Sequence, residues 1–257
     1  MIMFILCFLF ACKQIILPKP QWSDLRYRAT IAGSFSPDDT QDVPPAVLAA
    51  IPQTTLDIDW TLSFSPMQRH NDDSLTVRLT VVQANNTHNG NKLESAPIEG
   101  KYIDVRIFET GELLDYKYAE HWAHEDRYGD VFDLLLGVLF PNPPRVETSK
   151  PSPKILRWPL RYGQGTGGRH GVSALWSFDR AEENSVFLSY SGKWHTDGRW
   201  KKFSLLGRGE ANGQLVISEL GGLIEGHTID WNRKLCYGLQ QQICQKQRFV
   251  GEVKRIR

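Results

Sequence analysis

The amino-acid sequence predicts a mainly β protein in which a large curved antiparallel sheet, a half-barrel or open barrel, surrounds one buried apolar helix. Two segments, 55–65 and 74–82, alternate apolar and polar residues with a period of two, so each would form a strand with one apolar face. About ten or eleven one-sided segments joined by short turn signals indicate an antiparallel sheet. One segment, 130–139, is apolar nearly all round, which is typical of a buried helix. A one-faced sheet of this size must curl, and the helix would lie in its concavity.

The first half of the predicted domain, residues 25–140, begins with a strand at 25–35. A loop at 36–52 is expected next because it holds four prolines and three aspartates. The strand at 55–65 carries its large apolar residues at every second position, namely Leu56, Ile58, Trp60, Leu62 and Phe64. A turn at 70–73 joins it to the strand at 74–82, which predicts a hairpin.

Residues 85–96 are rich in asparagine and predict a polar loop. A second hairpin is expected from a strand at 102–108, a turn at 109–112 and a partner strand at 113–118. The helix at 130–139 would end at Pro141.

The second half, residues 156–257, returns to strands after a link at 141–159 whose six prolines predict an extended connection. Strands are expected at 171–179, 185–192, 200–209, 214–220, 223–231 and 248–254. Turn signals separate them at Glu182-Glu183-Asn184, Asp197-Gly198, Asn212-Gly213 and Gly221-Gly222. Together the two halves would form a single β-rich domain at 25–257.

The N-terminal segment 1–11 is uncharged and almost wholly apolar. It is shorter than the roughly 20 residues that a membrane-spanning helix needs, and it fits the apolar region of a signal peptide. A tether at 12–24 would follow, beginning with Cys12. The alternatives are another exported form and an ordinary buried N-terminal strand.

The sequence Leu9-Phe10-Ala11-Cys12 resembles the bacterial lipobox, with an aliphatic residue three positions before the cysteine and a small residue directly before it. It departs from the pattern in the bulk of Phe10 and in the lack of a Lys or Arg before the apolar run. The resemblance implies that Cys12 carries a diacylglycerol and anchors the protein in the bacterial cell envelope. Lys13 stands where an aspartate would retain some lipoproteins in the inner membrane, so outer-membrane sorting, facing the periplasm or the cell surface, is favoured.

The predicted outline is similar to envelope lipoproteins and carriers of the LolA/LolB and mycobacterial LppX type, which hold acyl chains between sheet and helix. The stretch Phe140-Pro-Asn-Pro-Pro144, followed by Trp158, also resembles uncharacterised β-rich envelope lipoproteins. In a carrier of this kind a ligand cavity would be lined by large apolar side chains of the strands and the helix. The candidates are Trp60, Phe64, Phe132, Leu135, Trp176 and Phe178. The alternative is that these side chains fill a closed core.

Charge and cysteine content narrow the class further. The net charge is +1, from 30 basic and 29 acidic residues, which argues against a nucleic-acid-binding protein because phosphate contacts need a basic surface. The predicted mature domain has only two cysteines besides Cys12, and we expect Cys236 and Cys244 to form a disulfide in an oxidising compartment. A metal site there would need further ligands, and only His227 is close in sequence.

Two sequence motifs that could form a metal-binding or phosphate-binding site are weak. His121 and His124 would share a face and could bind a metal if residues 120–126 formed a helix, whereas on a strand they would point apart; a solvated segment is the alternative. The glycine-rich stretch 163–168 lacks the Lys and the following helix of a phosphate-binding loop, so we expect a flexible loop. No Gly-x-Ser-x-Gly nucleophile signature occurs, and no cofactor is expected.

These observations predict an exported envelope lipoprotein that is not an enzyme and that binds a lipid-like or hydrophobic ligand, or an envelope protein partner, with its curved sheet. The alternative is a structural or assembly lipoprotein with a filled core that acts through its outer surface. An outer-membrane barrel is a third interpretation, because its lipid-facing strands also alternate. An internal apolar cavity of several hundred Å³ would favour the carrier.

Overall fold

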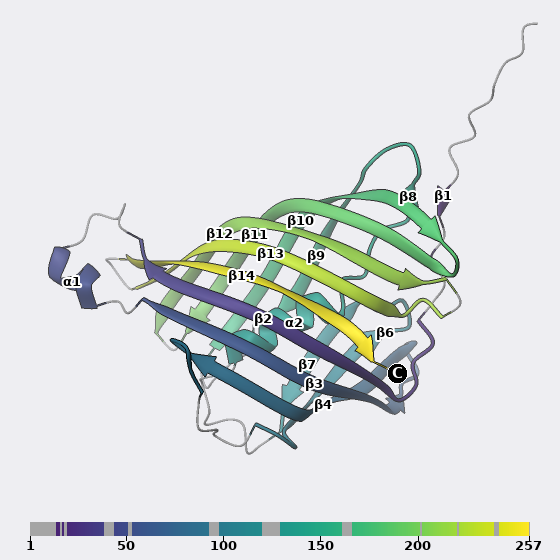
Figure 1. Ribbon diagram of the computed structural model, residues 1–257, viewed down its shortest axis with the longest axis horizontal. Helices are drawn as coiled ribbons and strands as arrows, with labels where there is room; N and C mark the ends of the chain where they lie inside the picture. The colour runs from purple at the N-terminus through teal and green to yellow at the C-terminus, as the bar shows by residue number, and fades with distance from the viewer. Residues whose placement is uncertain are drawn as a thin grey trace, which may run out of the picture.

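The sheet of this protein curls until its two edges approach each other (Figure 1). The structure is a computed structural model that describes residues 14–15, 17, 20–38, 44–50, 53–92, 98–119, 129–160, 166–200, 202–219, 221–238 and 242–256. Within these residues the main sheet has the strand order β7-β6-β4-β3-β2-β14-β13-β12-β11-β10-β9, with every neighbouring pair antiparallel. The predicted fold class, a large curved antiparallel sheet around one buried helix, is therefore confirmed.

The strands of the barrel are long. Their bounds are β2 (Leu25–Pro37), β3 (Thr54–Arg69), β4 (Ser74–His88), β6 (Tyr102–Phe108), β7 (Leu113–Tyr118), β9 (Ser152–Pro159), β10 (Thr166–Glu182), β11 (Ser185–Trp200), β12 (Phe203–Ser218), β13 (Ile224–Gly238) and β14 (Gln242–Ile256). Shorter elements are β1 (Gln14–Ile15), which pairs with β8 (Val146–Glu147), and β5 (Asn91–Lys92), which pairs with β4. The helices are α1 (Pro45–Ala50) and α2 (Gly129–Leu139).

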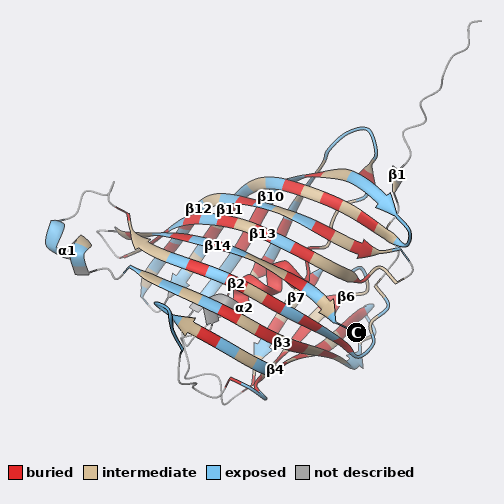
Figure 2. Cartoon of the chain, in the orientation of Figure 1, coloured by how far each residue is buried: buried red, intermediate tan, exposed pale blue. Residues whose placement is uncertain are grey.

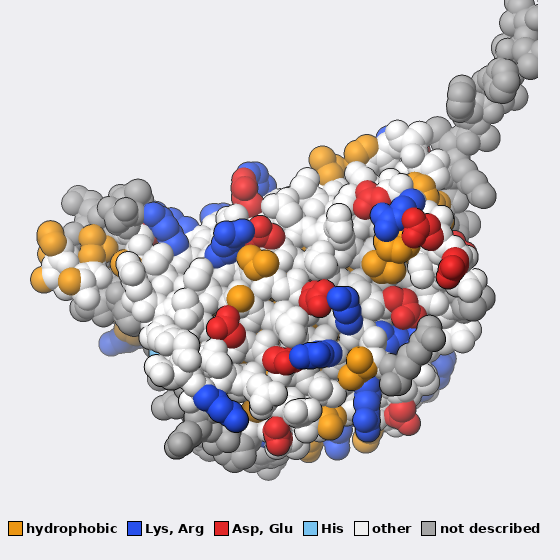
Figure 3. All heavy atoms as spheres, in the orientation of Figure 1, with side chains coloured by type: hydrophobic (Ala, Val, Ile, Leu, Met, Phe, Trp, Pro, Cys, Tyr) orange, Lys and Arg blue, Asp and Glu red, His pale blue; other side chains and the backbone are white. Residues whose placement is uncertain are grey.

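Alternation along each strand separates an apolar interior from a polar exterior (Figure 2). In β2, for example, Leu25, Tyr27 and Ala29 are buried, whereas the residues between them are exposed. The outer face carries charges of both signs, interspersed over the view in Figure 3. Several form cross-strand ion pairs, such as Arg28–Asp59, Arg78–Asp104 and Arg248–Asp230. An outer surface of this kind is suited to contact with water.

Helix α2 lies inside the curl of the sheet (Figure 1). The side chains of residues 134–139 are all buried, and Leu135, Leu136 and Val138 have no exposed surface. Gly137 faces the ring of Trp158 so closely that a Cβ atom there would lie 2.7 Å from the ring. The helix predicted at 130–139 is thus present and packed tightly against β9. No helix in the described part of the chain is long and apolar enough to cross a membrane.

The predicted loops contain more regular structure than expected. Residues 85–88 extend β4 instead of beginning a polar loop, and the side chain of Asn86 points inward, where its Oδ1 accepts a hydrogen bond from Trp60 Nε1 at 2.6 Å. The loop predicted at 36–52 includes α1. An asparagine can occur in a loop, or it can be buried and accept a hydrogen bond from an indole N–H. Local sequence does not distinguish these two uses of asparagine.

The proline-rich link predicted at 141–159 contains β9 at one edge of the sheet. Because an edge strand needs hydrogen-bond donors on only one side, it tolerates Pro153 and Pro159. The glycine-rich stretch 163–168 is partly strand as well, since β10 begins at Thr166; its first residues lie outside the described part of the chain.

The turns predicted at 197–198 and 212–213 lie within β11 and β12. A Cβ on Gly213 would meet the Cζ atom of Tyr190 at 2.6 Å, so this glycine leaves room for an aromatic ring on the next strand. Glycine in a strand is therefore a sign of close packing here and not of a chain reversal.

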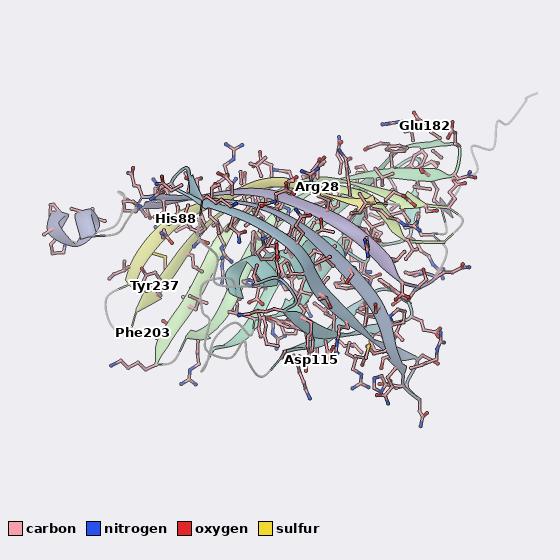
Figure 4. All side chains as sticks on the ribbon, turned by 60° about the horizontal axis from the view of Figure 1, so that its bottom comes forward. Arg28, His88, Asp115, Glu182, Phe203 and Tyr237 are labelled. Atoms are coloured by element: carbon pink, nitrogen blue, oxygen red, sulfur yellow. A yellow bond between two sulfur atoms is a disulfide. The ribbon has the colours of Figure 1, made fainter. Side chains whose placement is uncertain are left out.

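The barrel has two unlike ends. At one, which we call the tether end, lie the turns 109–112, 183–184 and 219–223 and the N-terminal tether (Leu17 and residues 20–24). At the other, the disulfide end, Cys236 of β13 faces Cys244 of β14 and is bonded to it. Figure 4 shows Glu182 near the first end and Phe203 and Tyr237 near the second.

Candidate functional site

The centre of the barrel is filled. Trp60, Leu135 and Trp176, three of the residues predicted to line a cavity, lie in the core with no exposed surface. Four further buried rings pack around α2 from β9, β10, β11 and β13, with centroids 5.0 Å to 6.3 Å apart; they are Trp158, His170, Trp194 and Trp231. Phe178 is partly buried at the margin of this core. These contacts favour a packed interior over a central ligand chamber.

A chain of hydrogen bonds fixes the C-terminal end of α2 to the wall. The backbone carbonyl of Val138 can only accept, so His227 Nδ1, 2.6 Å away, must carry the proton. Burial lowers the pKa of His227 to about 4, so the ring is neutral and its Nε2 accepts from the Tyr190 hydroxyl at 3.0 Å. Tyr190 in turn accepts from Trp231 Nε1 at 2.9 Å. Every member of this chain is buried, and each donor in it has a defined acceptor.

A second buried polar group surrounds Asp133 of α2. The Tyr116 hydroxyl donates to its carboxylate, and His170 Nε2 lies 3.9 Å from the other carboxylate oxygen. His170 Nδ1 is 2.8 Å from the Thr196 hydroxyl. Burial, followed by the charges of Arg233 and His195, holds the pKa of His170 well below its usual value.

The Asp, His and Thr of this group have the residue types of a nucleophilic triad, but they are closed to any substrate. Asp133 and Thr196 have no exposed surface and His170 is 2% exposed. None of them lines a described pocket. The group therefore connects α2 to the barrel wall through Tyr116 and is not a catalytic site.

An apolar pocket of about 360 Å³ opens at the tether end of the barrel. Its walls come from the tether, from β2 and β3, from the end of α2 and the residues after it, and from the turns before β7 and β13. Its apolar and aromatic lining consists of Leu17, Pro20, Trp22, Tyr27, Phe64, Leu139, Phe140, Pro141, Pro143, Pro144, Ile217, Leu223 and Ile224. Of the five predicted cavity residues whose side chains the structure describes, only Phe64 lines this pocket.

Aromatic side chains form one continuous wall of the pocket. The ring of Phe64 contacts Tyr27 and Phe140 at centroid distances of 5.1 Å and 6.0 Å, and Trp22 lies 5.9 Å from Phe140. Tyr27 donates to the carbonyl of Ile224 at 3.0 Å, and burial raises the pKa of its hydroxyl. This hydrogen bond ties the aromatic wall on β2 to β13, which lies two strands along the same sheet.

The N-terminal tether crosses the pocket and is fixed on both sides. Gln21 donates its backbone N–H to the carbonyl of Gly221 at 2.9 Å, on the turn before β13. Pro20 packs against Gly111, on the turn before β7. Upstream, β1 pairs with β8. The tether is therefore part of the pocket wall.

Polar groups are few in the lining. Arg145 is the only charged residue among the lining residues that the structure describes, and it is exposed at the rim. Trp22 Nε1 is shielded from solvent and has no hydrogen-bond acceptor among the described residues. A larger hollow of about 570 Å³ next to Phe64 is bordered mainly by polar and charged side chains and lacks this apolar character.

The remaining predicted site residues have different outcomes. Cys236 and Cys244 form the expected disulfide. Cys12, His121, His124 and the side chain of Phe132 lie outside the described residues. Within the described part of the chain no cluster of three or more His, Cys, Asp or Glu could hold a metal ion. Trp22 and Arg145 were not predicted, because an aromatic residue in a tether and a lone arginine after a proline run carry no periodic signal.

Comparison with protein-family models and with curated protein sequences found no match to this chain. The site must therefore be interpreted from its own geometry.

Proposed function

We propose that this protein is an exported, non-enzymatic envelope lipoprotein that holds one lipid-like ligand in the tether-end pocket. The observation that carries the proposal is the pocket itself, an apolar hollow of about 360 Å³ with an aromatic wall. Its volume falls within the range of about 300–1,000 Å³ that is typical of ligand sites. Replacing water against exposed apolar walls with a hydrophobic ligand lowers the free energy of the system, which favours binding.

The position of the pocket agrees with an anchor at Cys12. Cys12 is only five positions before Leu17, which lines the pocket, so a fully extended chain would hold the two within roughly 18 Å. A diacylglycerol on Cys12 would therefore keep the pocket mouth close to the membrane surface. A lipid leaving that surface would have a short path into the pocket.

The second candidate is a structural or assembly lipoprotein that acts through its outer surface. The filled centre of the barrel favours it, because α2 and the tryptophans around it leave the interior without a central chamber. The two candidates differ in what the tether-end pocket contains.

Native mass spectrometry of the protein purified from its envelope tests the ligand. We expect a co-purifying lipid on the wild-type chain and its loss in Leu223→Trp, because the indole would fill the pocket. Leu206→Trp, on the exposed outer face of β12, is the matched control and should retain the lipid. The structural candidate would be favoured if the wild-type protein is ligand-free and its melting temperature does not change when lipids are added.

Metabolic labelling with a radioactive fatty acid tests the anchor. Wild-type protein should be labelled and membrane-bound, and Cys12→Ser should be unlabelled and released, because two acyl chains are needed for stable anchoring. The Cys12→Ser protein should keep its fold, since the buried core cluster is formed by residues between Leu25 and Val253. Unlabelled wild-type protein would contradict the anchor and leave the pocket proposal to be judged separately.

A further inference from the structure

The size of the pocket limits the ligand. A volume of about 360 Å³ lies near the lower end of the usual range for ligand sites. Phe64, Leu139 and Ile217 contribute apolar side chains to the lining from β3, α2 and β12, whereas the polar lining residues Thr110, Asn142 and Arg145 come from a turn and from the segment after α2. A single slender chain with one polar end fits this distribution better than a lipid with two acyl chains.

The rim of the tether-end pocket carries the positive charge of Arg145, which is not paired with any described residue. Arg145 makes no hydrogen bond or ion pair with any residue that the structure describes, and no Asp or Glu is among the described lining residues. Glu112, outside the lining, accepts from Asn142 Nδ2 at 3.4 Å. Arg255, in contrast, is already paired with Glu225 at 2.9 Å. Arg145 is thus available to an anionic group on a ligand.

The pocket lining also includes Trp22, whose indole N–H is a hydrogen-bond donor. Trp22 Nε1 is buried and lacks an acceptor among the described residues. A buried donor without a partner is costly, and a ligand that supplies an acceptor would remove that cost. An indole N–H can only donate, so the complementary group on the ligand is an oxygen acceptor.

We propose that the tether-end pocket selects an amphiphile with one acyl chain and an anionic oxygen headgroup, held by the Arg145 guanidinium and by Trp22 Nε1. This inference rests on the proposed function and adds the chemical class of the ligand. The headgroup is a carboxylate if the ligand is a free fatty acid, or a phosphate if it is a monoacyl phospholipid. Both place an acyl chain against Phe64 and Leu223 and an anion at the rim.

Binding of matched amphiphiles to the full-length Cys12→Ser chain tests the proposal, because this variant has no acyl chain of its own to occupy the pocket. The probes are palmitate, its neutral methyl ester and a palmitoyl lysophosphatidic acid, each below its aggregation concentration. We expect the ester to bind about tenfold more weakly than palmitate, since charge-assisted hydrogen bonds to the headgroup are lost. The tighter of the two anions identifies the source of the headgroup.

Variants separate the two contacts. Arg145→Gln should weaken palmitate by about three- to tenfold while leaving the ester unchanged, because the contact is at an exposed rim. Arg145→Lys should retain most of the affinity. Trp22→Phe keeps the aromatic wall but removes the donor, so it should weaken acid and ester alike. Arg169→Gln, an exposed arginine of β10 away from the pocket, is the control and should bind as the parent does.

Equal affinity for palmitate and its ester, unchanged by Arg145→Gln, would overturn the headgroup assignment and leave apolar ligand binding intact. Failure of every amphiphile to bind would overturn the proposed function itself.

Discussion

At the scale of single residues, Tyr190 links the barrel wall to the helix inside it. Its hydroxyl accepts from Trp231 and donates to His227, which donates to the Val138 carbonyl. Tyr190→Phe would leave one buried donor and one buried acceptor without a partner. We expect the free energy of unfolding to fall by about 1–3 kcal/mol, measured by urea denaturation. Tyr237→Phe, at the disulfide end, is the control and should change it by less; equal losses would contradict the role of the chain.

His227 also predicts how stability depends on pH. Its pKa is about 4 in the folded protein because burial opposes the charged form, against 6.5 for the exposed group. The unfolded chain therefore takes up this proton first, and the stabilisation present above about pH 6.5 is lost as pH falls toward 4. His170, whose pKa is also lowered by burial, acts in the same direction.

Between pH 7.5 and 4.5 we expect His227 alone to reduce the free energy of unfolding by roughly 2–3 kcal/mol. His227→Asn keeps a donor for the Val138 carbonyl but cannot titrate, so its stability should vary less with pH over this window. Denaturant titrations of both proteins at several pH values make the comparison. An identical pH dependence in the two proteins would exclude His227 as the source.

At the scale of elements, the sequence predicts a helix or strand correctly where its residue pattern is typical of only one kind of element. The hairpin at 102–118 matches β6 and β7, and the helix predicted at 130–139 is α2. Prediction fails where a residue type has two uses. Gly213 belongs to a predicted turn but lies within β12, where it leaves room for the Tyr190 ring. Asn86 belongs to a predicted loop but lies within β4, where it accepts a hydrogen bond from Trp60. Such uses depend on a neighbouring strand that local sequence does not identify.

Gly137 gives a test of how tightly α2 fills the barrel. In an exposed helix, Gly→Ala usually stabilises by about 1 kcal/mol. Here the new methyl group would lie 2.7 Å from the Trp158 ring, so we expect Gly137→Ala to destabilise by about 1–3 kcal/mol. Gly226→Ala, whose nearest neighbours would be 3.9 Å away, should be tolerated. A stabilised Gly137→Ala protein would show that α2 packs more loosely than described.

The disulfide joins β13 and β14 at directly opposed positions eight residues apart in sequence. Closing so short a loop is worth about 2.5 kcal/mol on the chain-entropy estimate. Cys236→Ala/Cys244→Ala should therefore lose about this much stability while keeping the sheet. Peptide mapping without reduction should show the two cysteines linked in protein purified from its cells, and two free thiols would contradict the pairing.

At the scale of the whole molecule, the sequence predicts the curved sheet better than it predicts how the interior of the sheet is filled. The alternation of Leu56 to Phe64 requires a one-faced sheet, and the apolar residues of α2 require a place inside it. Neither pattern states how much volume remains once the helix is in place. The structure fills the centre and leaves the pocket at one end, where Trp22 and Arg145 contribute from segments without periodicity. Of the predicted cavity residues with described side chains, only Phe64 lines the pocket.

The central claim is that an acyl chain occupies the tether-end pocket, and photocrosslinking tests it most directly. Full-length Cys12→Ser protein would be irradiated with a palmitate analogue that carries a diazirine in mid-chain, and the adducts mapped by peptide mass spectrometry. We predict adducts at residues 139–145 and 222–224, suppressed by excess palmitate and by Leu223→Trp. The claim would be contradicted if the adducts lie only on exposed apolar side chains of the outer face, such as Leu175 and Leu206, and if excess palmitate does not suppress them.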